Sequence, residues 1–383
     1  MNQRAYLDYN ATAPRRPEVR EAVQAALDLV GNPSSVHAEG RAARAAVEEA
    51  RASVAGLVGA SAEDVIFTSG GTEANAIALA APASGGNWKA FLSGIEHPSV
   101  LSGGRFEPDG FAVLPVTGDG VVDLEILAGM LEDDVPDGCR PFVSLMAANN
   151  ETGALQPIAE AAAIVHEAGG VLHTDAVQMA GRLPIDIRGL GADLLTLSAH
   201  KTGGPKGVGA LILAEGADIR PLMTGGGQES RRRPGTENVA GIVGFGVAAK
   251  LASYDLASMR GVAQLRDELE EGVRRIAPDA VVFAQAAARL PNTSCIAVPG
   301  LKAETLVIGL DLAGVSISAG SACSSGKVET SHVLMAMGAQ PEVARAAIRM
   351  SLGFETSSDD IQGFLGAFGD LVKRLRKSER EAA

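Results

Sequence analysis

The 383-residue sequence contains few cysteines and no recognisable metal-binding pattern. Its three cysteines, Cys139, Cys295 and Cys323, are an odd and widely spaced set, which argues against a disulfide framework. The sequence has no CxxC, no HExxH and no cluster of histidines and cysteines at ligand spacing. A metal site is therefore not expected, and each thiol has to be considered separately.

The sequence also lacks long apolar runs and an excess of basic residues. No stretch of roughly 18 apolar residues is free of charges or turn residues, so no membrane-spanning helix is predicted. The first residues contain no apolar stretch of signal-peptide length, and a cytoplasmic location is the default expectation. The formal net charge of −13 would repel nucleic acid and anionic membranes, so we expect neither as a partner.

The distribution of apolar residues predicts an α/β fold. Short apolar runs alternate with helical patterns from about residue 14 to residue 250, and the clearest runs are 64–67, 142–146, 170–173 and 194–197. Runs of this length that are buried on both faces and separated by helices are typical of a mostly parallel sheet. We therefore predict a large domain over residues 14–250.

The pattern changes after about residue 250. A charged helix over 259–277 precedes strands near 281–283 and 295–298, and apolar residues at helical spacing from Ile361 to Leu375 predict a C-terminal helix. The run 5–8 predicts an N-terminal strand that joins this part. Residues 1–13 and 251–383 are therefore predicted to form a smaller α+β domain.

Four predicted strand ends carry polar residues, and parallel sheets bind ligands beyond the carboxyl ends of their strands. After Phe67, a glycine turn places Thr72 at a predicted helix N-cap, where free N–H groups favour a phosphate. An ordinary capped turn is the alternative. Asp175 follows the second strand, and a carboxylate there could keep a pyridine nitrogen protonated. Its alternative role is to cap the next helix.

The other two strand ends carry Lys201 and His97. Lys201 lies between Ser198-Ala199-His200 and a glycine turn, which suits a lysine that forms a Schiff base beside phosphate donors. A solvated surface lysine is the alternative. His97 precedes Pro98 and could stack on a flat ring or move protons, and its alternative is a hydrogen-bonded loop histidine.

These motifs occur in a fixed order with others that span nearly the whole chain. The full set is 6–12, 31–37, 68–75, 149–153, 156–158, 173–178, 197–207, 225–229, 233–238, 321–326 and 348–353. In this order they resemble the cysteine desulfurases of the NifS/IscS type, which belong to the class V aminotransferase group of fold-type I pyridoxal-phosphate (PLP) enzymes. The resemblance implies that fold and PLP as the cofactor.

The resemblance also implies a role for each matching position. Lys201 would attach the cofactor, Asp175 would pair with its pyridine nitrogen, and His97 would stack on its ring and relay protons. The remaining implied contacts are Asn150 and Gln178 near the ring hydroxyl, and Gly71, Thr72, Ser198 and His200 at the phosphate. Thr236 matches a threonine that completes the phosphate site of a second subunit, so the resemblance implies a homodimer.

Two further residues decide which reaction is predicted. Cys323 lies among small polar residues between Gly320 and Gly326, which is typical of a mobile loop. Burial as a small hydrophobe suits Cys295 and Cys139 better. A mobile thiol could take the sulfur of a bound cysteine. Arg349 could bind the substrate carboxylate, with Asn150 beside it, or be a surface strand arginine.

The predicted function is a PLP-dependent cysteine desulfurase. It would convert L-cysteine to L-alanine, hold the sulfur on Cys323 as a persulfide and pass it to an acceptor protein, such as an iron–sulfur scaffold or a sulfur relay. Two alternatives stay open. One is a lyase acting on selenocysteine or cysteine sulfinate, and the other is a catalytically idle scaffold for sulfur assembly.

Overall fold

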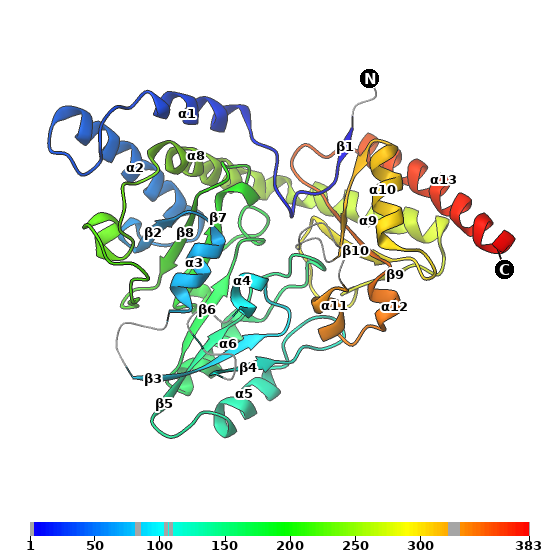
Figure 1. Ribbon diagram of the computed structural model, residues 1–383, viewed down its shortest axis with the longest axis horizontal. Coiled ribbons are helices and arrows are strands. Elements are labelled where there is room, and N and C mark those ends of the chain that lie inside the picture. The colour runs from blue at the N-terminus through cyan, green and yellow to red at the C-terminus, as the bar shows by residue number, and fades with distance from the viewer. Residues whose placement is uncertain (1–3, 81–85, 103–105, 107–109, 321–329, 383) are drawn as a thin grey trace.

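The computed structural model describes residues 4–80, 86–102, 106, 110–320 and 330–382. Figure 1 shows a large sheet with helices on both faces and, beside it, a second and smaller group of strands and helices. The large sheet has seven strands, in the spatial order β2 (Val65–Thr68), β8 (Gly209–Leu213), β7 (Leu194–Ser198), β6 (Val171–Asp175), β5 (Cys139–Ser144), β3 (Asn87–Ser93) and β4 (Phe111–Leu114). All neighbours are parallel except those of β8, which confirms the predicted mostly parallel sheet.

Alternating side chains along the strands explain why both faces of this sheet are covered. On β8, Ala210 and Ile212 belong to one apolar core, whereas Leu211 and Leu213 belong to another on the opposite face. The helices of this part are α1 (Pro17–Leu27), α2 (Ala38–Leu57), α3 (Gly71–Ala78), α4 (Pro98–Leu101), α5 (Leu124–Asp133), α6 (Ile158–Glu167), α7 (Ile187–Leu190) and α8 (Val239–Asp255). The first core contains residues of α2, α5, α6 and α8, and the second contains residues of α3.

Helix α8 is part of an unusually apolar stretch. By length and composition alone, the helical stretch Val239–Ile276 could cross a membrane. In the fold, α8 packs against α1 and α2 instead. A Cβ atom on Gly246 would lie 2.5 Å from the Cα atom of Ala50, and one on Gly244 would lie 2.5 Å from Val23. This close packing accounts for the apolar composition, which is that of a core helix.

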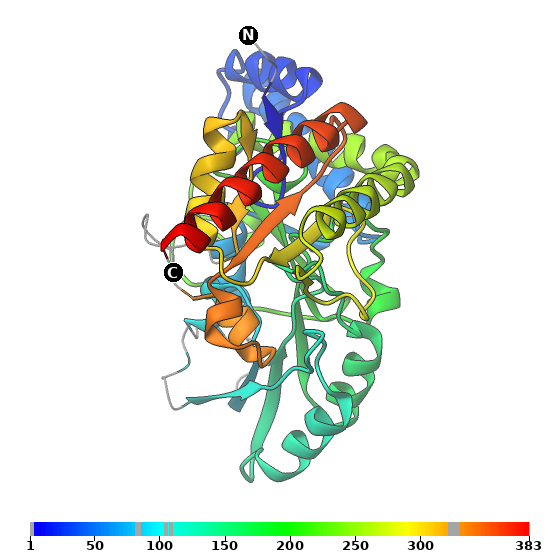
Figure 2. The same ribbon diagram turned by 90° about the vertical axis from the view of Figure 1, so that its right-hand side faces the viewer.

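The second group contains a four-stranded antiparallel sheet in the order β12 (Ser318–Ala319), β13 (Ala347–Ser351), β10 (Thr293–Ala297) and β9 (Val281–Val282). Its helices are α9 (Met259–Ile276), α10 (Ala303–Leu312), α11 (His332–Ala336), α12 (Pro341–Ala344) and α13 (Ser358–Ala382). Figure 2 shows α13, in red, running across these strands. Its side chains Phe364 and Phe368 are fully buried and stack at 5.5 Å, as the helical spacing of its apolar residues predicts.

The N-terminal segment joins this second group, as predicted. Strand β1 (Ala5–Tyr6) pairs in parallel with β11 (Val315–Ser316), and Ala5 and Leu7 are buried in the same core as α9 and α13. The chain then passes the end of β7, where the Ala13 amide donates to the His200 carbonyl at 2.9 Å. The predicted boundary at residue 250 stays a prediction, and α8 runs through that position.

Candidate active site

The carboxyl ends of the parallel strands open into a cavity of about 400 Å³. We call it the Lys201 cavity. Ten of the residues predicted from the sequence line it, namely Gly71, Thr72, His97, Asn150, Asp175, Gln178, Ser198, His200, Lys201 and Arg349. They come from five loops or strands of the large sheet and from β13, so residues far apart in the sequence meet at one place.

Lys201 stands in a single 3-10 turn, Ala199–Lys201, directly after β7. Its Nζ atom donates hydrogen bonds to the carbonyl oxygens of Asn10, at 2.5 Å, and Ala11, at 3.1 Å. Gln178 Nε2 donates to the same Asn10 oxygen at 3.0 Å. The N-terminal segment therefore fixes the amine at the edge of the cavity.

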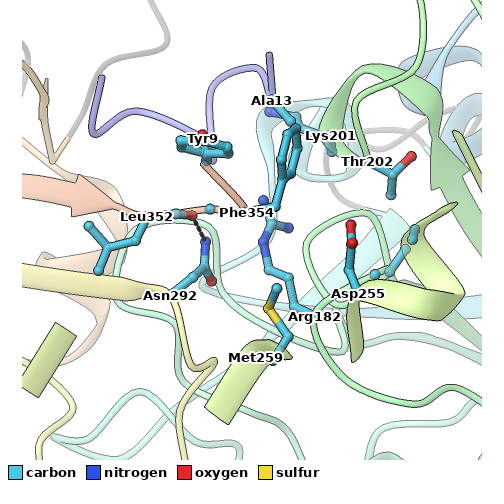
Figure 3. A pocket seen from close by; sticks show the side chains of 14 residues that line it. Tyr9, Ala13, Arg182, Lys201, Thr202, Asp255, Met259, Asn292, Leu352 and Phe354 are labelled. Atoms are coloured by element: carbon cyan, nitrogen blue, oxygen red, sulfur yellow. Dashed lines mark hydrogen bonds between the residues drawn. The ribbon is translucent and has the colours of Figure 1, made fainter. Parts of the chain in front are cut away.

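Figure 3 shows a second cavity that shares Lys201 with the first. Its volume is about 30 Å³, which is space for roughly one water molecule. The Arg182 side chain lines it, and burial, aided by the nearby charge of Arg349, lowers the pKa of Arg182 to about 10. Asn292 also lines this cavity and donates to the Leu352 carbonyl at 3.1 Å, the dashed line in Figure 3. This cavity is too small for an amino-acid substrate, so the Lys201 cavity is the candidate site.

A chain of hydrogen bonds connects Asp175 to His97. The two hydrogens of Asn75 Nδ2 reach Asp175 Oδ2 at 2.8 Å and Ser99 Oγ at 2.9 Å. Ser99 Oγ lies 2.8 Å from His97 Nδ1, and Asp175 Oδ1 accepts from the Val177 amide at 3.0 Å. Asp175 thus lines the cavity and closes the turn that follows β6, but it does not cap the next helix, because α7 begins at Ile187 and its N-cap is Asp186.

The protonation of His97 follows from its partners. Its Nδ1 atom accepts a hydrogen bond from the Ser99 amide at 3.1 Å, and an amide can only donate, so the ring proton belongs on Nε2. Burial lowers the pKa of His97, and the nearby Lys201 adds to this while Asp175 opposes it. His97 lines the cavity, and its lowered pKa favours the neutral imidazole.

The start of α3, which lines the cavity, has the features of a phosphate site. α3 begins at Gly71, and its N-cap is Gly70, so the prediction that Thr72 is the N-cap is wrong. Thr72 instead lies in the first turn, where amide groups lack helical partners. A Cβ atom on Gly71 would lie 3.2 Å from Val177 Cγ2, so glycine keeps the backbone open here. Burial lowers the pKa of His200 to about 4, and Lys201 adds to this.

Arg349 lies on β13 and is buried at 3% exposure, so it is not the surface arginine of the alternative interpretation. Its Nη2 atom donates to Asp8 Oδ1 at 2.7 Å, and Nη1 donates to the Asn150 carbonyl at 3.1 Å. Its Nε atom has no hydrogen-bond partner among the described residues. A buried guanidinium with an unused donor can bind a carboxylate.

The two remaining predicted site residues are Thr236 and Cys323. Thr236 is exposed and does not line the Lys201 cavity of its own chain. Cys323 lies outside the described residues, in the segment 321–329. Of the other thiols, Cys295 is fully buried as predicted, but Cys139 is half-buried because it begins β5 at the edge of the core.

Sequence reasoning missed several residues of the site. Asn75 and Ser99 form the link between Asp175 and His97, and Asn10 holds Lys201 and Gln178 through its carbonyl. Helical spacing could have identified Asn75, because it lies one turn after Thr72 and therefore on the same face of the helix. Asn10 contacts Lys201 through its backbone carbonyl, so its residue type gives no sign of this role.

The fold, the cavity and the order of its residues define the class of protein. A model of the aminotransferase class-V family matches residues 5–364, and the chain belongs to this family. Over 98% of its length the chain is 41% identical to a cysteine desulfurase IscS of Dictyoglomus turgidum, which it covers to 96%. It is 43% identical, again over 98%, to a cysteine desulfurase of Cereibacter sphaeroides, which it covers to 97%.

Within that family, the chain groups with the cysteine desulfurases of the NifS/IscS type. The crystal structure of a NifS-like protein from Rickettsia africae superposes with a TM-score of 0.88 at 37% identity. The superposition covers 97% of this chain and 100% of that one. The predicted fold-type I architecture is thereby confirmed.

Proposed function

We propose that the protein is a PLP-dependent cysteine desulfurase that converts L-cysteine to L-alanine and transfers the sulfur to Cys323 as a persulfide. One observation carries the proposal: Lys201, Asp175, His97 and the buried Arg349 line a single cavity of about 400 Å³ in a chain of this family. The proposed location is the cytoplasm, and the proposed acceptor is a sulfur-carrier or iron–sulfur scaffold protein.

The residues of the cavity fit PLP. Gly71, Thr72, Ser198 and His200 would hold the phosphate, with Thr236 of a second copy completing the site. Asp175 would face the pyridine nitrogen, and Gln178 and Asn150 would lie near the ring hydroxyl. Gln178 Oε1 and Asn75 Oδ1 are buried and have no partner among the described residues, as expected for atoms that face a polar ligand. Bound at Lys201, the cofactor supplies an electron sink for charge that develops on the substrate carbon.

Each side chain of the site would then have its own role in the reaction. Arg349 binds the substrate carboxylate and orients the amino acid, while His97 and Lys201 move protons at the substrate carbon and nitrogen. The Cys323 thiolate attacks the substrate sulfur. A sulfur–sulfur bond forms, the carbon–sulfur bond breaks, and its electron pair goes to the carbon, which is protonated to give alanine.

The test is alanine formation from L-cysteine with a reductant, compared between the wild type and Cys323→Ala. We expect the variant to lose at least about 100-fold in rate, because no other thiol is proposed to attack the substrate sulfur. Cys139→Ala is the matched control, since this half-buried thiol lies at the far end of β5, and it should keep the wild-type rate.

The outcome also separates the alternatives. Wild-type alanine formation by Cys323→Ala would contradict a persulfide mechanism and favour a lyase acting on selenocysteine or cysteine sulfinate. A wild-type protein that binds no PLP and forms no alanine from cysteine would instead favour an idle scaffold.

A further inference from the structure

The segment that leads to Thr236 contains an unusual backbone turn. Three consecutive residues other than glycine have positive φ angles: Glu229 at 46°, Ser230 at 55° and Arg231 at 67°. A Cβ atom makes this left-handed conformation costly, and it normally occurs at single positions. Such a turn persists only where the surrounding structure holds it in place.

The buried Glu229 side chain holds this turn. Its two carboxylate oxygens accept hydrogen bonds from Nη1 and Nη2 of Arg51 on α2, at 2.7 and 2.8 Å. Oε2 also accepts from the Phe67 amide of β2 at 3.0 Å. The side chains of both Glu229 and Arg51 are almost excluded from solvent, at 2% and 11% exposure. The charged pair therefore fixes the left-handed turn against the large sheet.

The same segment is also held after the turn. Gln228 Oε1 accepts from the Gly235 amide at 3.2 Å, so the chain folds back on itself directly before Thr236. Arg233 donates to both oxygens of Glu73, at 2.9 and 3.3 Å, and Glu73 lies in the first turn of α3. We call residues 228–236 the arm. Both anchors fix the arm while leaving Thr236 exposed.

We propose that Glu229, paired with Arg51, is a positioning residue that presents Thr236 to the phosphate site of a second copy of this chain. The inference rests on the proposed homodimer and on the proposed cofactor. Loss of the negative charge in Glu229→Gln would leave one carbonyl oxygen for the three donors of Arg51 and Phe67, and would place an amide NH₂ group against the Arg51 guanidinium. The left-handed turn then relaxes toward ordinary conformations, and Thr236 moves with the arm.

The test uses mixed dimers in which one subunit carries Lys201→Ala, so that only the other subunit binds PLP through its lysine. Glu229→Gln is placed either on the Lys201→Ala subunit, whose arm serves the intact site, or on the subunit that owns the intact site. The dissociation constant of PLP is measured from the visible absorbance of the intact site. We expect about tenfold weaker binding in the first arrangement and less than about threefold in the second.

Two controls separate positioning from folding. Glu48→Gln removes the exposed carboxylate that also pairs with Arg51, at 3.1 Å, without touching the arm, and it should leave PLP affinity unchanged. Ser230→Gly should also leave it unchanged, because glycine adopts the left-handed conformation without cost. Ser230→Val should weaken PLP binding in the same trans arrangement as Glu229→Gln, because a β-branched residue disfavours that conformation.

The inference is overturned if the loss of affinity follows the subunit that owns the intact site, because Glu229 would then act only within its own chain. A wild-type protein that is monomeric and still binds PLP would also overturn it. Failure of the proposed desulfurase reaction is a separate result. It would appear as a lack of alanine formation by the wild type and would leave the comparison of PLP affinities intact.

Discussion

The guanidinium of Arg349 is held on two sides before any substrate arrives. Asp8 accepts from Nη2, the Asn150 carbonyl accepts from Nη1, and Nε is left without a partner among the described residues. A side chain fixed in this way loses little conformational freedom when it binds a planar carboxylate. Asp8 therefore orients the group that is proposed to bind the substrate.

Asp8→Ala should raise the KM for cysteine by about tenfold with a smaller effect on kcat, because a charged hydrogen bond that orients Arg349 is lost. Asp8→Asn should recover most of this loss, since its amide oxygen can still accept from Nη2. Steady-state kinetics measure both values. Asp311→Ala, which removes the exposed partner of Arg4, is the control. An unchanged KM in Asp8→Ala would contradict the orienting role.

Glu151 is a buried carboxyl group between the two halves of the molecule. Ser331, the N-cap of α11, donates to Glu151 Oε2 at 2.5 Å. Burial raises the pKa of Glu151 to about 7, although the Ser331 hydrogen bond and the charge of Arg349 oppose the shift. Between its ordinary value of 4.5 and about 7, the folded protein keeps a proton that the unfolded chain has lost.

Because the folded state binds more protons in this range, the contribution of Glu151 to stability falls as the pH rises from about 4.5 to 7. Glu151→Gln removes this dependence. We expect its stability relative to the wild type to increase between pH 5 and pH 8 by up to about 3 kcal/mol. Urea unfolding at both pH values measures the difference, with the exposed Glu160→Gln as control. A difference that does not change with pH would argue against a titrating Glu151.

At the scale of elements, the turn between β2 and α3 depends on the lack of a side chain at one position. A Cβ atom on Gly71 would lie 3.2 Å from Val177 Cγ2 and 3.5 Å from Ser198 Cβ. Val177 lies in the loop that follows β6, and Ser198 is the last residue of β7. The start of α3 therefore approaches the other strand ends as closely as its backbone allows.

Gly71→Ala should weaken PLP binding by about tenfold, because the helix start or Val177 must give way by a few tenths of an ångström. Gly56→Ala is the matched control. This glycine lies in α2, and a Cβ atom there would have no neighbour within 4 Å, so alanine should stabilise the protein by roughly 0.5–1 kcal/mol and leave PLP affinity unchanged. Equal PLP affinities for Gly71→Ala and the wild type would show that the close approach of Gly71 to Val177 does not matter for PLP binding.

The sequence was sufficient to predict which strand ends carry the site. Apolar runs mark the strands, and Asp175 and Lys201 follow them directly, so their meeting in one cavity is a consequence of a parallel sheet. The contribution of Asn10 could not be predicted, because it holds Lys201 through its backbone carbonyl, and every residue has such a carbonyl. The left-handed turn at Ser230 could not be predicted either, because the tertiary contacts of Glu229 impose a conformation that the local sequence disfavours.

At the scale of the whole molecule, Asn10 connects the two groups of strands. Its Nδ2 atom donates to the Asn150 carbonyl at 3.1 Å and to Thr293 Oγ1 at 2.9 Å, and its Oδ1 atom accepts from Asn292 at 3.0 Å. Its amide donates to Ser351 Oγ at 2.9 Å. The residue is 1% exposed and also holds Lys201 through its carbonyl. The position of the Lys201 amine thus depends on how the two groups of strands pack together.

Asn10→Ala should lower the free energy of unfolding by roughly 2–4 kcal/mol, because three side-chain hydrogen bonds, two of them buried, lose one partner each. The loss falls between the two groups of strands, so we expect one thermal transition for the wild type and two for the variant. Calorimetry of the cofactor-free protein measures both effects.

Asn32→Ala is the control for this prediction. The exposed Asn32 side chain accepts only from the Ser34 amide, at 2.9 Å, among the described residues, and its loss should leave the transition single. If Asn10→Ala lowered stability but still unfolded in one step, Asn10 would stabilise the molecule without coupling its two groups. The backbone that follows β1 would then hold the residue-10 carbonyl, and with it the Lys201 amine, without the Asn10 side chain. The PLP affinity of Asn10→Ala would match that of the wild type. We expect the opposite, a loss of affinity together with the split transition, because the Asn10 carbonyl that holds Lys201 is fixed by the side chain of the same residue.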